Sequence, residues 1–145
     1  MAESHNAILS NPSVRAALQD AWAASEPGVS GGHEEGGFVT RDENGNLDVV
    51  RWPVGERDSM RVPLHQNCKF GDRWIVATFH THPNTGDDYL HEPSETDKRA
   101  VRDDPDLKGS DYVGEFVISC EMIFLITQAG RVSEVAETRE LFGKQ

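Results

Sequence analysis

Residues 74–83 have the sequence WIVATFHTHP, an almost continuous apolar run that ends in two histidines. Such a run is typical of a strand in the middle of a sheet, where both faces are buried. Side chains two apart on a strand point to the same face, so His80 and His82 are expected to aim both imidazoles at one point, with Thr81 turned away. The stretch therefore predicts a central strand with a polar site at its end, where a cleft can open.

Upstream of this strand, the sequence predicts an amphipathic helix. Asn11 is a suitable N-cap, Pro12 suits the first helical position, and SEPG at 25–28 ends the pattern. The apolar residues recur at helical spacing, which predicts one buried face. They are Val14, Ala17, Leu18, Ala21 and Trp22.

Further segments predict the rest of a sheet. Residues 36–52 have the pattern of a hairpin, with DENGN at 42–46 as its turn and Asn44-Gly45 as the centre of that turn. After the central strand, three apolar stretches predict a β-meander. They are GEFVIS at 114–119, MIFLIT at 122–127 and RVSEV at 131–135.

Two segments remain between these elements. Residues 56–73 contain a proline and scattered charge and are expected to be mostly loop, whereas residues 94–102 look like a short helix. The order along the chain is then helix, hairpin, central strand, loop, helix and meander. This order predicts an α/β or α+β fold, with helices flanking a mixed β-sheet, in one domain over residues 1–145.

Composition limits the kinds of partner. The chain has 14 basic and 25 acidic residues, a formal net charge of -11, which disfavours binding to nucleic acid. It has no apolar run near the ~18 residues of a membrane span and no visible secretory signal, so we expect a cytoplasmic protein with no membrane partner. Two cysteines, Cys68 and Cys120, are expected to be buried or half-buried thiols, with a single bridge as the alternative.

A second pair of polar residues follows the central strand. Ser94 and Asp97 are three apart and share one face of a first helical turn. If that turn folds back over the strand end, two imidazoles and one carboxylate converge, which with a water is the usual composition of a catalytic zinc site. The alternative is a helix capping box, in which Ser94 is the N-cap and Asp97 reaches back to it.

Together, HTHP at 80–83 and SETD at 94–97 resemble the H-x-H-P…S-x-x-D signature of the JAB/MPN metalloproteases, the JAMM family. Its members include deubiquitinases and compact prokaryotic domains. The family pattern also has a glutamate on an early strand, three residues before a glycine, and EEGGFV offers Glu34, with Gly37 three positions on. The resemblance covers the chain from about Glu34 to the strands after Glu115. It implies an MPN/JAB-like (cytidine-deaminase-like) fold.

The resemblance also implies a role for each of five residues. His80, His82 and Asp97 would be ligands of Zn²⁺, with a water in the fourth position. Glu34 would take a proton from that water and deliver it to the leaving amine. Ser94 would donate a hydrogen bond to the oxyanion that forms on the scissile carbonyl.

The chain departs from the family pattern in two respects. Ten residues, NTGDDYLHEP at 84–93, separate Pro83 from Ser94, where family members commonly have six or seven. This insertion brings alternative ligands near the site, namely Asp87, Asp88, His91 and Glu92. In addition, Glu34 is adjacent to Glu35, and the sequence leaves open which of them faces the metal, although the glycine spacing favours Glu34.

The function expected from the resemblance is that of a zinc-dependent metallopeptidase or isopeptidase. Its substrate would be a peptide or a protein, of the ubiquitin-like or sulfur-carrier type. The alternative is a non-enzymatic interaction module of MPN-like fold with a structural zinc, its fourth position filled by His91 or Asp88. The RadC-like branch shares the signature and is tied to DNA metabolism, but the acidic balance disfavours direct DNA binding. The oligomeric state is not predicted by the sequence.

Overall fold

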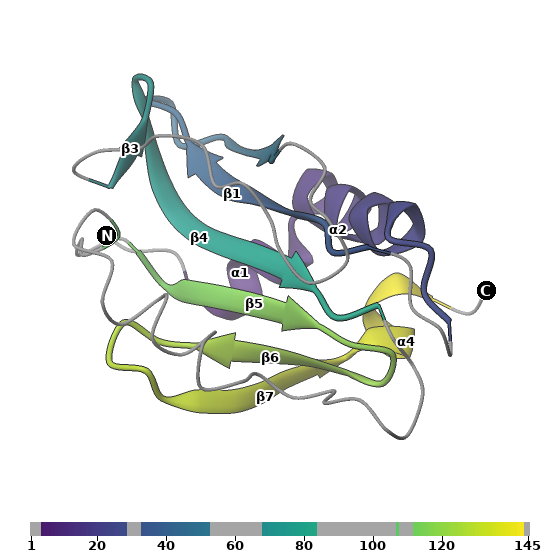
Figure 1. Cartoon of the computed structure of the whole chain (residues 1–145). Coiled ribbons are helices and arrows are strands. Elements are labelled where there is room, and N and C mark those ends of the chain that lie inside the picture. The colour runs from purple at the N-terminus through teal and green to yellow at the C-terminus, as the bar shows by residue number, and fades with distance from the viewer. Residues whose placement is uncertain (1–3, 29–32, 53–67, 84–106, 108–111, 144–145) are drawn as a thin grey trace.

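The computed structural model describes residues 4–28, 33–52, 68–83, 107 and 112–143 of the chain. These residues form a seven-stranded sheet in the order β2-β1-β4-β5-β6-β7, with the short strand β3 paired to β4 (Figure 1). The strands are β1 (Gly36–Arg41), β2 (Leu47–Arg51), β3 (Lys69–Phe70), β4 (Arg73–Thr81), β5 (Gly114–Ile118), β6 (Met122–Ile126) and β7 (Val132–Glu137). β4 and β5 are parallel, and the other described pairs are antiparallel. The protein is therefore a mixed α/β fold built on a mixed sheet.

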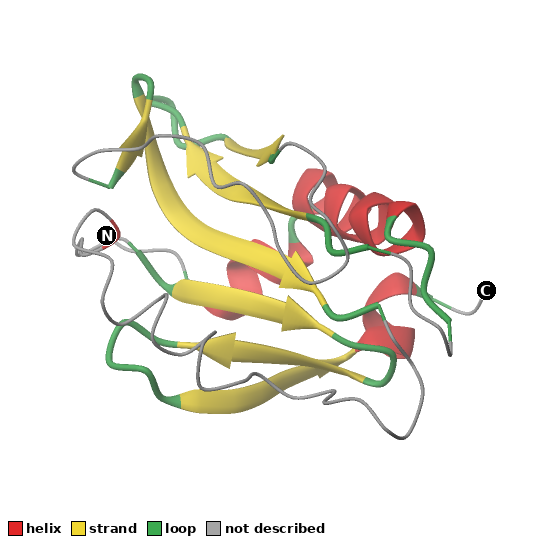
Figure 2. Ribbon diagram, in the orientation of Figure 1, coloured by secondary structure: helices red, strands yellow, loops and turns green. Residues whose placement is uncertain are grey.

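One face of this sheet is covered by the helices, which are α1 (His5–Ser10), α2 (Pro12–Ala24) and α4 (Thr138–Phe142) (Figure 2). The side chain of Asn11 accepts hydrogen bonds from the backbone N–H groups of Ser13 and Val14, so α2 begins at the predicted cap. α2 buries one apolar side against the sheet. The core of this face joins helix residues to alternate strand residues. Its fully buried members include Ile8, Val14, Leu18, Ala21, Ala77, Phe79, Phe116, Ile118 and Ile123.

The opposite face of the sheet carries a second apolar cluster, which includes Phe38, Ile75 and Val117. Phe79 belongs to the helix-covered face, so the neighbouring residues Thr78 and His80 point to the opposite face. Because both faces of β4 are buried, its sequence lacks the regular alternation of apolar and polar residues that a strand with one exposed face has. Thr78 and His80 of its C-terminal half therefore lie on the face away from the helices, and this position decides where the candidate site lies.

The main sequence predictions for the sheet are confirmed. The hairpin over 36–52 is β1 and β2, the central strand is β4 between β1 and β5, and the meander is β5, β6 and β7. The turn centre was wrong by one residue. The backbone N–H of Gly45 donates to the carbonyl of Asp42, so the central residues are Glu43 and Asn44, and Gly45 follows with φ of 84°.

Three elements differ from the expectation or were missed. β3 lies within the segment predicted as loop, and the described part of that segment is residues 68–73. α1 and α4 were not predicted, because each has only about one turn and little periodicity to detect. The helix predicted at 94–102 lies outside the described residues.

The cysteines behave as the sequence predicts. The two do not form the alternative disulfide, and Cys68 is buried whereas Cys120 is half-buried. Burial raises the pKa of the Cys120 thiol, with the nearby Glu121 carboxylate acting in the same direction.

The hairpin turn generates a prediction about stability. Gly45 has a left-handed backbone, which an L side chain adopts at a cost of about 1–2 kcal/mol. We therefore expect Gly45→Ala to lower the free energy of unfolding by that amount in urea denaturation. Gly28→Ala is the matched control, because its Cβ would meet no described atom within 4 Å and its φ is not left-handed. An equal loss in both variants would mean that the turn conformation is not what Gly45 provides.

Candidate metal centre

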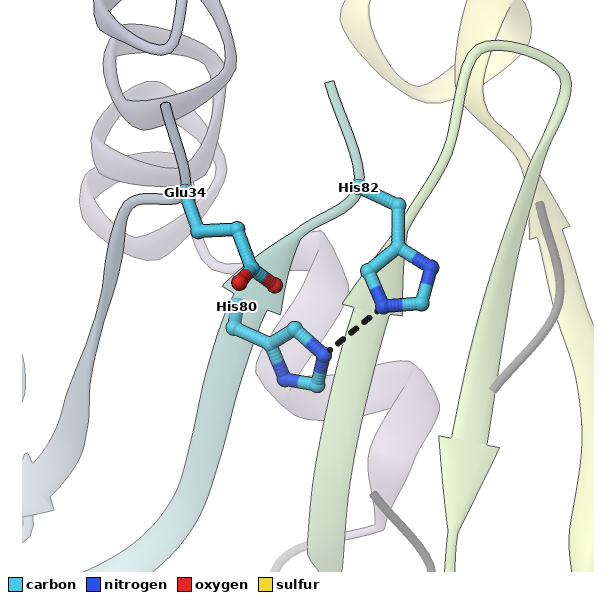
Figure 3. Close-up of side chains that lie close together, drawn as sticks. All are labelled: Glu34, His80 and His82. Atoms are coloured by element: carbon cyan, nitrogen blue, oxygen red, sulfur yellow. Dashed lines mark hydrogen bonds between the residues drawn. The ribbon is translucent and has the colours of Figure 1, made fainter. Parts of the chain in front are cut away.

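Three residues bring possible metal ligands together at the end of β4. One ligand atom from each of Glu34, His80 and His82 lies within 4.8 Å of the other two (Figure 3). His80 is the second-last residue of β4, His82 follows the strand, and Glu34 precedes β1. β1 and β4 are antiparallel neighbours, so the start of one strand meets the end of the other. The site therefore lies at the end of the β1–β4 pair where β1 begins and β4 finishes.

Backbone hydrogen bonds fix these three residues relative to one another. The N–H of Thr81 donates to the carbonyl of Glu35 at 2.9 Å, and the N–H of Glu35 donates to Oγ1 of Thr81 at 3.0 Å. On the other side, the N–H of His82 donates to the carbonyl of Ile118 at 2.8 Å. Residues 34 and 35 are thus attached to residues 80–82, and His82 is attached to β5. The backbone that carries the three residues is therefore held by hydrogen bonds at the ends of paired strands.

The two imidazoles lie within hydrogen-bond distance of each other, a spacing that is also compatible with a shared metal ion. Their Nε2 atoms lie 3.1 Å apart, and the rings are 5.0 Å apart between centroids. Two nitrogens bound to one tetrahedral zinc at 2.0–2.1 Å lie about 3.3 Å from each other. His80 is only 3% exposed, whereas Glu34 and His82 are half-buried, so the group opens toward solvent on one side. Spacing and donor chemistry both fit a zinc ion.

A buried carboxylate contacts the imidazole of His80. Nδ1 of His80 is 3.1 Å from Oε2 of Glu115, a residue of β5. Glu115 was not predicted from the sequence to belong to the site. The signal was nevertheless present, since Glu115 is the one charged residue in the apolar stretch GEFVIS.

The structure distinguishes Glu34 from Glu35. Glu35 is not part of the ligand group, and its carboxylate contacts the imidazole of His33 and forms an ion pair with Arg51. It is buried at 4% exposure, and its carboxylate oxygens are occupied by the guanidinium of Arg51 and the imidazole of His33. Glu34 is the residue that stands beside His80 and His82. Neighbouring residues in extended backbone point in opposite directions, which is why only one of the two can face the site.

The other predicted site residues lie outside the described part of the chain. These are Ser94 and Asp97, together with the insertion at 84–93 and its alternative ligands Asp87, Asp88, His91 and Glu92. Of the five residues given a role by the family resemblance, the structure brings three together.

Comparisons with known proteins add no assignment: no protein-family model, curated protein or solved structure matches the chain. Among the described residues, no helix has the length and apolar character needed to cross a membrane.

The ligand geometry predicts which histidines hold metal. Protein purified without chelators should contain about one equivalent of zinc by elemental analysis, and His80→Ala or His82→Ala should remove most of it, since each loses one of few ligands. His5→Ala is the control, because His5 lies on α1 outside the ligand group. Zinc retained at full occupancy in both site variants would rule out this metal centre.

The ion pairs of Glu35 predict a difference between two arginines. Arg51→Met removes the cation from a buried carboxylate, which should lower the free energy of unfolding by about 1–3 kcal/mol. Arg73→Met removes a 3.0 Å pair with Asp48, whose side chain is 63% exposed, and should cost about 0–1 kcal/mol. Chemical denaturation of both variants measures the difference. Equal losses would show that burial of Glu35 does not make its pairing important.

Proposed function

We propose that this protein is a zinc-dependent metallopeptidase or isopeptidase, which hydrolyses a peptide or isopeptide bond. The observation that supports the proposal is the placement of a half-buried carboxylate, Glu34, beside the converging nitrogens of His80 and His82. A base next to a pair of metal ligands is the arrangement that metal-assisted hydrolysis needs. The resemblance of HTHP and SETD to the JAB/MPN signature points to the same chemistry, within an MPN/JAB-like fold.

The donor set favours zinc among the common metals. Two imidazoles and a carboxylate, with one position left for water, are the ligands of catalytic zinc sites. His80 and His82 would supply the nitrogens, and Asp97 would supply the third ligand. A zinc ion bound there would lower the pKa of a coordinated water to about 7 and polarise the scissile carbonyl.

Glu34 is proposed as the group that moves the proton. Its carboxylate takes a proton as the water oxygen forms a bond to the carbonyl carbon, and later gives that proton to the amine nitrogen as the C–N bond breaks. A positioned acid–base group of this kind contributes a factor of about 10²–10⁴ in rate. The residue after Glu34 is hydrogen-bonded to Thr81 of β4, so the backbone that carries Glu34 is held beside the strand that carries His80.

Ser94 is proposed as the donor that stabilises the oxyanion on the carbonyl. Removing one such donor typically costs about 10²–10³ in rate. The proposed substrate is a peptide or a protein of the ubiquitin-like or sulfur-carrier type.

One observation also favours the non-enzymatic alternative, an MPN-like interaction module with a structural zinc. The ligand atom of Glu34 lies within 4.8 Å of both imidazole nitrogens, so a small shift would make it a third ligand. A structural zinc site has all four positions filled by protein atoms. The two proposals therefore differ in whether Glu34 holds the metal or acts beside it.

The variant Glu34→Gln separates these two roles. As a general base, Glu34 can be replaced without loss of zinc, while cleavage of a peptide library or a ubiquitin-like fusion should fall by about 10²–10⁴. As a ligand, its replacement should remove zinc as well. Elemental analysis and single-turnover cleavage of the same preparation measure both quantities.

Glu35→Gln is the matched control, since Glu35 is adjacent in sequence but paired with Arg51 and His33. Glutamine keeps one acceptor oxygen for Arg51, and its amide N–H can donate to Nε2 of a neutral His33, so activity below the unfolding temperature should stay near that of the wild type. Equal cleavage by the wild type and both variants would mean that neither carboxylate is the base, and the peptidase proposal would be wrong. If Glu35→Gln were inactive and Glu34→Gln active, the general base would be Glu35 instead of Glu34.

A further inference from the structure

Glu115 is a buried carboxylate whose surroundings differ from those of Glu35. It is 8% exposed, and among the described residues its side chain has one polar partner, Nδ1 of His80 at 3.1 Å. Its neighbours on the same face of the sheet include the apolar residue Val117. No Lys or Arg of the described residues lies beside it, and burying a carboxylate without such a partner costs free energy, so these contacts give it no stabilising role in the fold.

The parallel pairing of β4 and β5 places Glu115 beside His80. Glu115 is in register with Thr78, and Val117 is in register with His80, so the carboxylate reaches the imidazole diagonally across the two strands. The start of β5 is fixed at Gly114, where a Cβ would lie 2.2 Å from the carbonyl oxygen of Ile126. The position of Glu115 behind His80 is therefore set by backbone pairing.

The contact determines which nitrogen of His80 carries a proton. A carboxylate only accepts hydrogen bonds, so the imidazole nitrogen that faces it must be the donor. A neutral imidazole has one N–H, and with that proton on Nδ1 the lone pair is on Nε2. Nε2 is the atom that lies 3.1 Å from Nε2 of His82 in the ligand group. Without Glu115, the proton can move to Nε2 and block the metal.

We propose that Glu115 is the positioning residue of this metal centre: it holds the proton of His80 on Nδ1, so that the lone pair of Nε2 faces the metal. The inference rests on the proposed zinc site, to which it adds a residue that touches neither metal nor substrate. Carboxylates behind a metal-binding histidine fix the ring and raise its basicity, and their loss typically lowers metal affinity about 10–100-fold.

The first experiment measures the proton position without any metal. Long-range ¹H–¹⁵N correlation NMR of the metal-free protein, at a pH where His80 is neutral, identifies the protonated ring nitrogen. Wild-type His80 should carry its proton on Nδ1, and Glu115→Ala should shift it wholly or partly to Nε2. A wild-type protein with the proton on Nε2 would overturn the inference, whatever the fate of the peptidase proposal.

The second experiment compares zinc affinity with stability. Competition with a chromogenic chelator should show a loss of about 10–100-fold for Glu115→Ala, and a smaller loss for Glu115→Gln, whose amide oxygen still accepts from Nδ1. Thermal unfolding of the metal-free proteins should show Glu115→Gln at least as stable as the wild type, because a buried charge is removed. Glu134→Gln, which changes an exposed carboxylate of β7, should alter neither quantity.

The outcomes separate this inference from the proposed function. Unchanged zinc affinity in Glu115→Ala, or a loss of affinity matched by a loss of metal-free stability, would overturn the positioning role. A wild-type protein that binds no zinc would overturn both proposals. If the wild type bound zinc but cleaved no substrate, and Glu115→Ala bound zinc more weakly, only the peptidase proposal would be overturned. The positioning role of Glu115 would be supported.

Discussion

The structure depends on the antiparallel contact between the residues before β1 and the end of β4. Thr81 is central to it, since its N–H donates to the carbonyl of Glu35 and its hydroxyl accepts the N–H of the same residue. Antiparallel strands have side chains of period two, so a slip of one residue would exchange the faces of Glu34 and Glu35. The pairing therefore decides which carboxylate faces the histidines.

Much of the fold and part of the site follow from local sequence pattern. Alternation along the strand places the side chains of His80 and His82 on one side, and the side chain of Asn11 caps the start of α2. Both features could be predicted because each depends on residues only a few positions apart. The choice of Glu34 over Glu35 is different. The glycine spacing favoured it, but the physical reasons are contacts between strands: Thr81 of β4 fixes the register of the segment before β1, and Arg51 of β2 pairs with Glu35. A contact between strands cannot be read from the spacing within one of them.

Glu115 shows why the rest of the site could not be predicted. The partner of His80 is 35 positions away, and the two meet only because β5 pairs in parallel with β4 at one register. A lone glutamate in an apolar strand indicates that something polar lies nearby, but the sequence does not say what. α1 and α4 were missed for another reason, since one helical turn carries too few residues for a period to emerge.

The two buried glutamates illustrate how a sheet can carry acidic groups for different purposes. Glu35 is surrounded by a guanidinium and an imidazole, and it links the segment before β1 to β2. Glu115 has no such cation beside it among the described residues, and its one polar contact is a candidate ligand. A buried charge that stabilises a fold is expected to be paired with an opposite charge of the protein itself. A buried charge that positions a metal ligand can instead lower the stability of the metal-free protein. By this criterion Glu35 belongs to the framework, and Glu115 has the surroundings expected of a residue that serves the proposed metal centre.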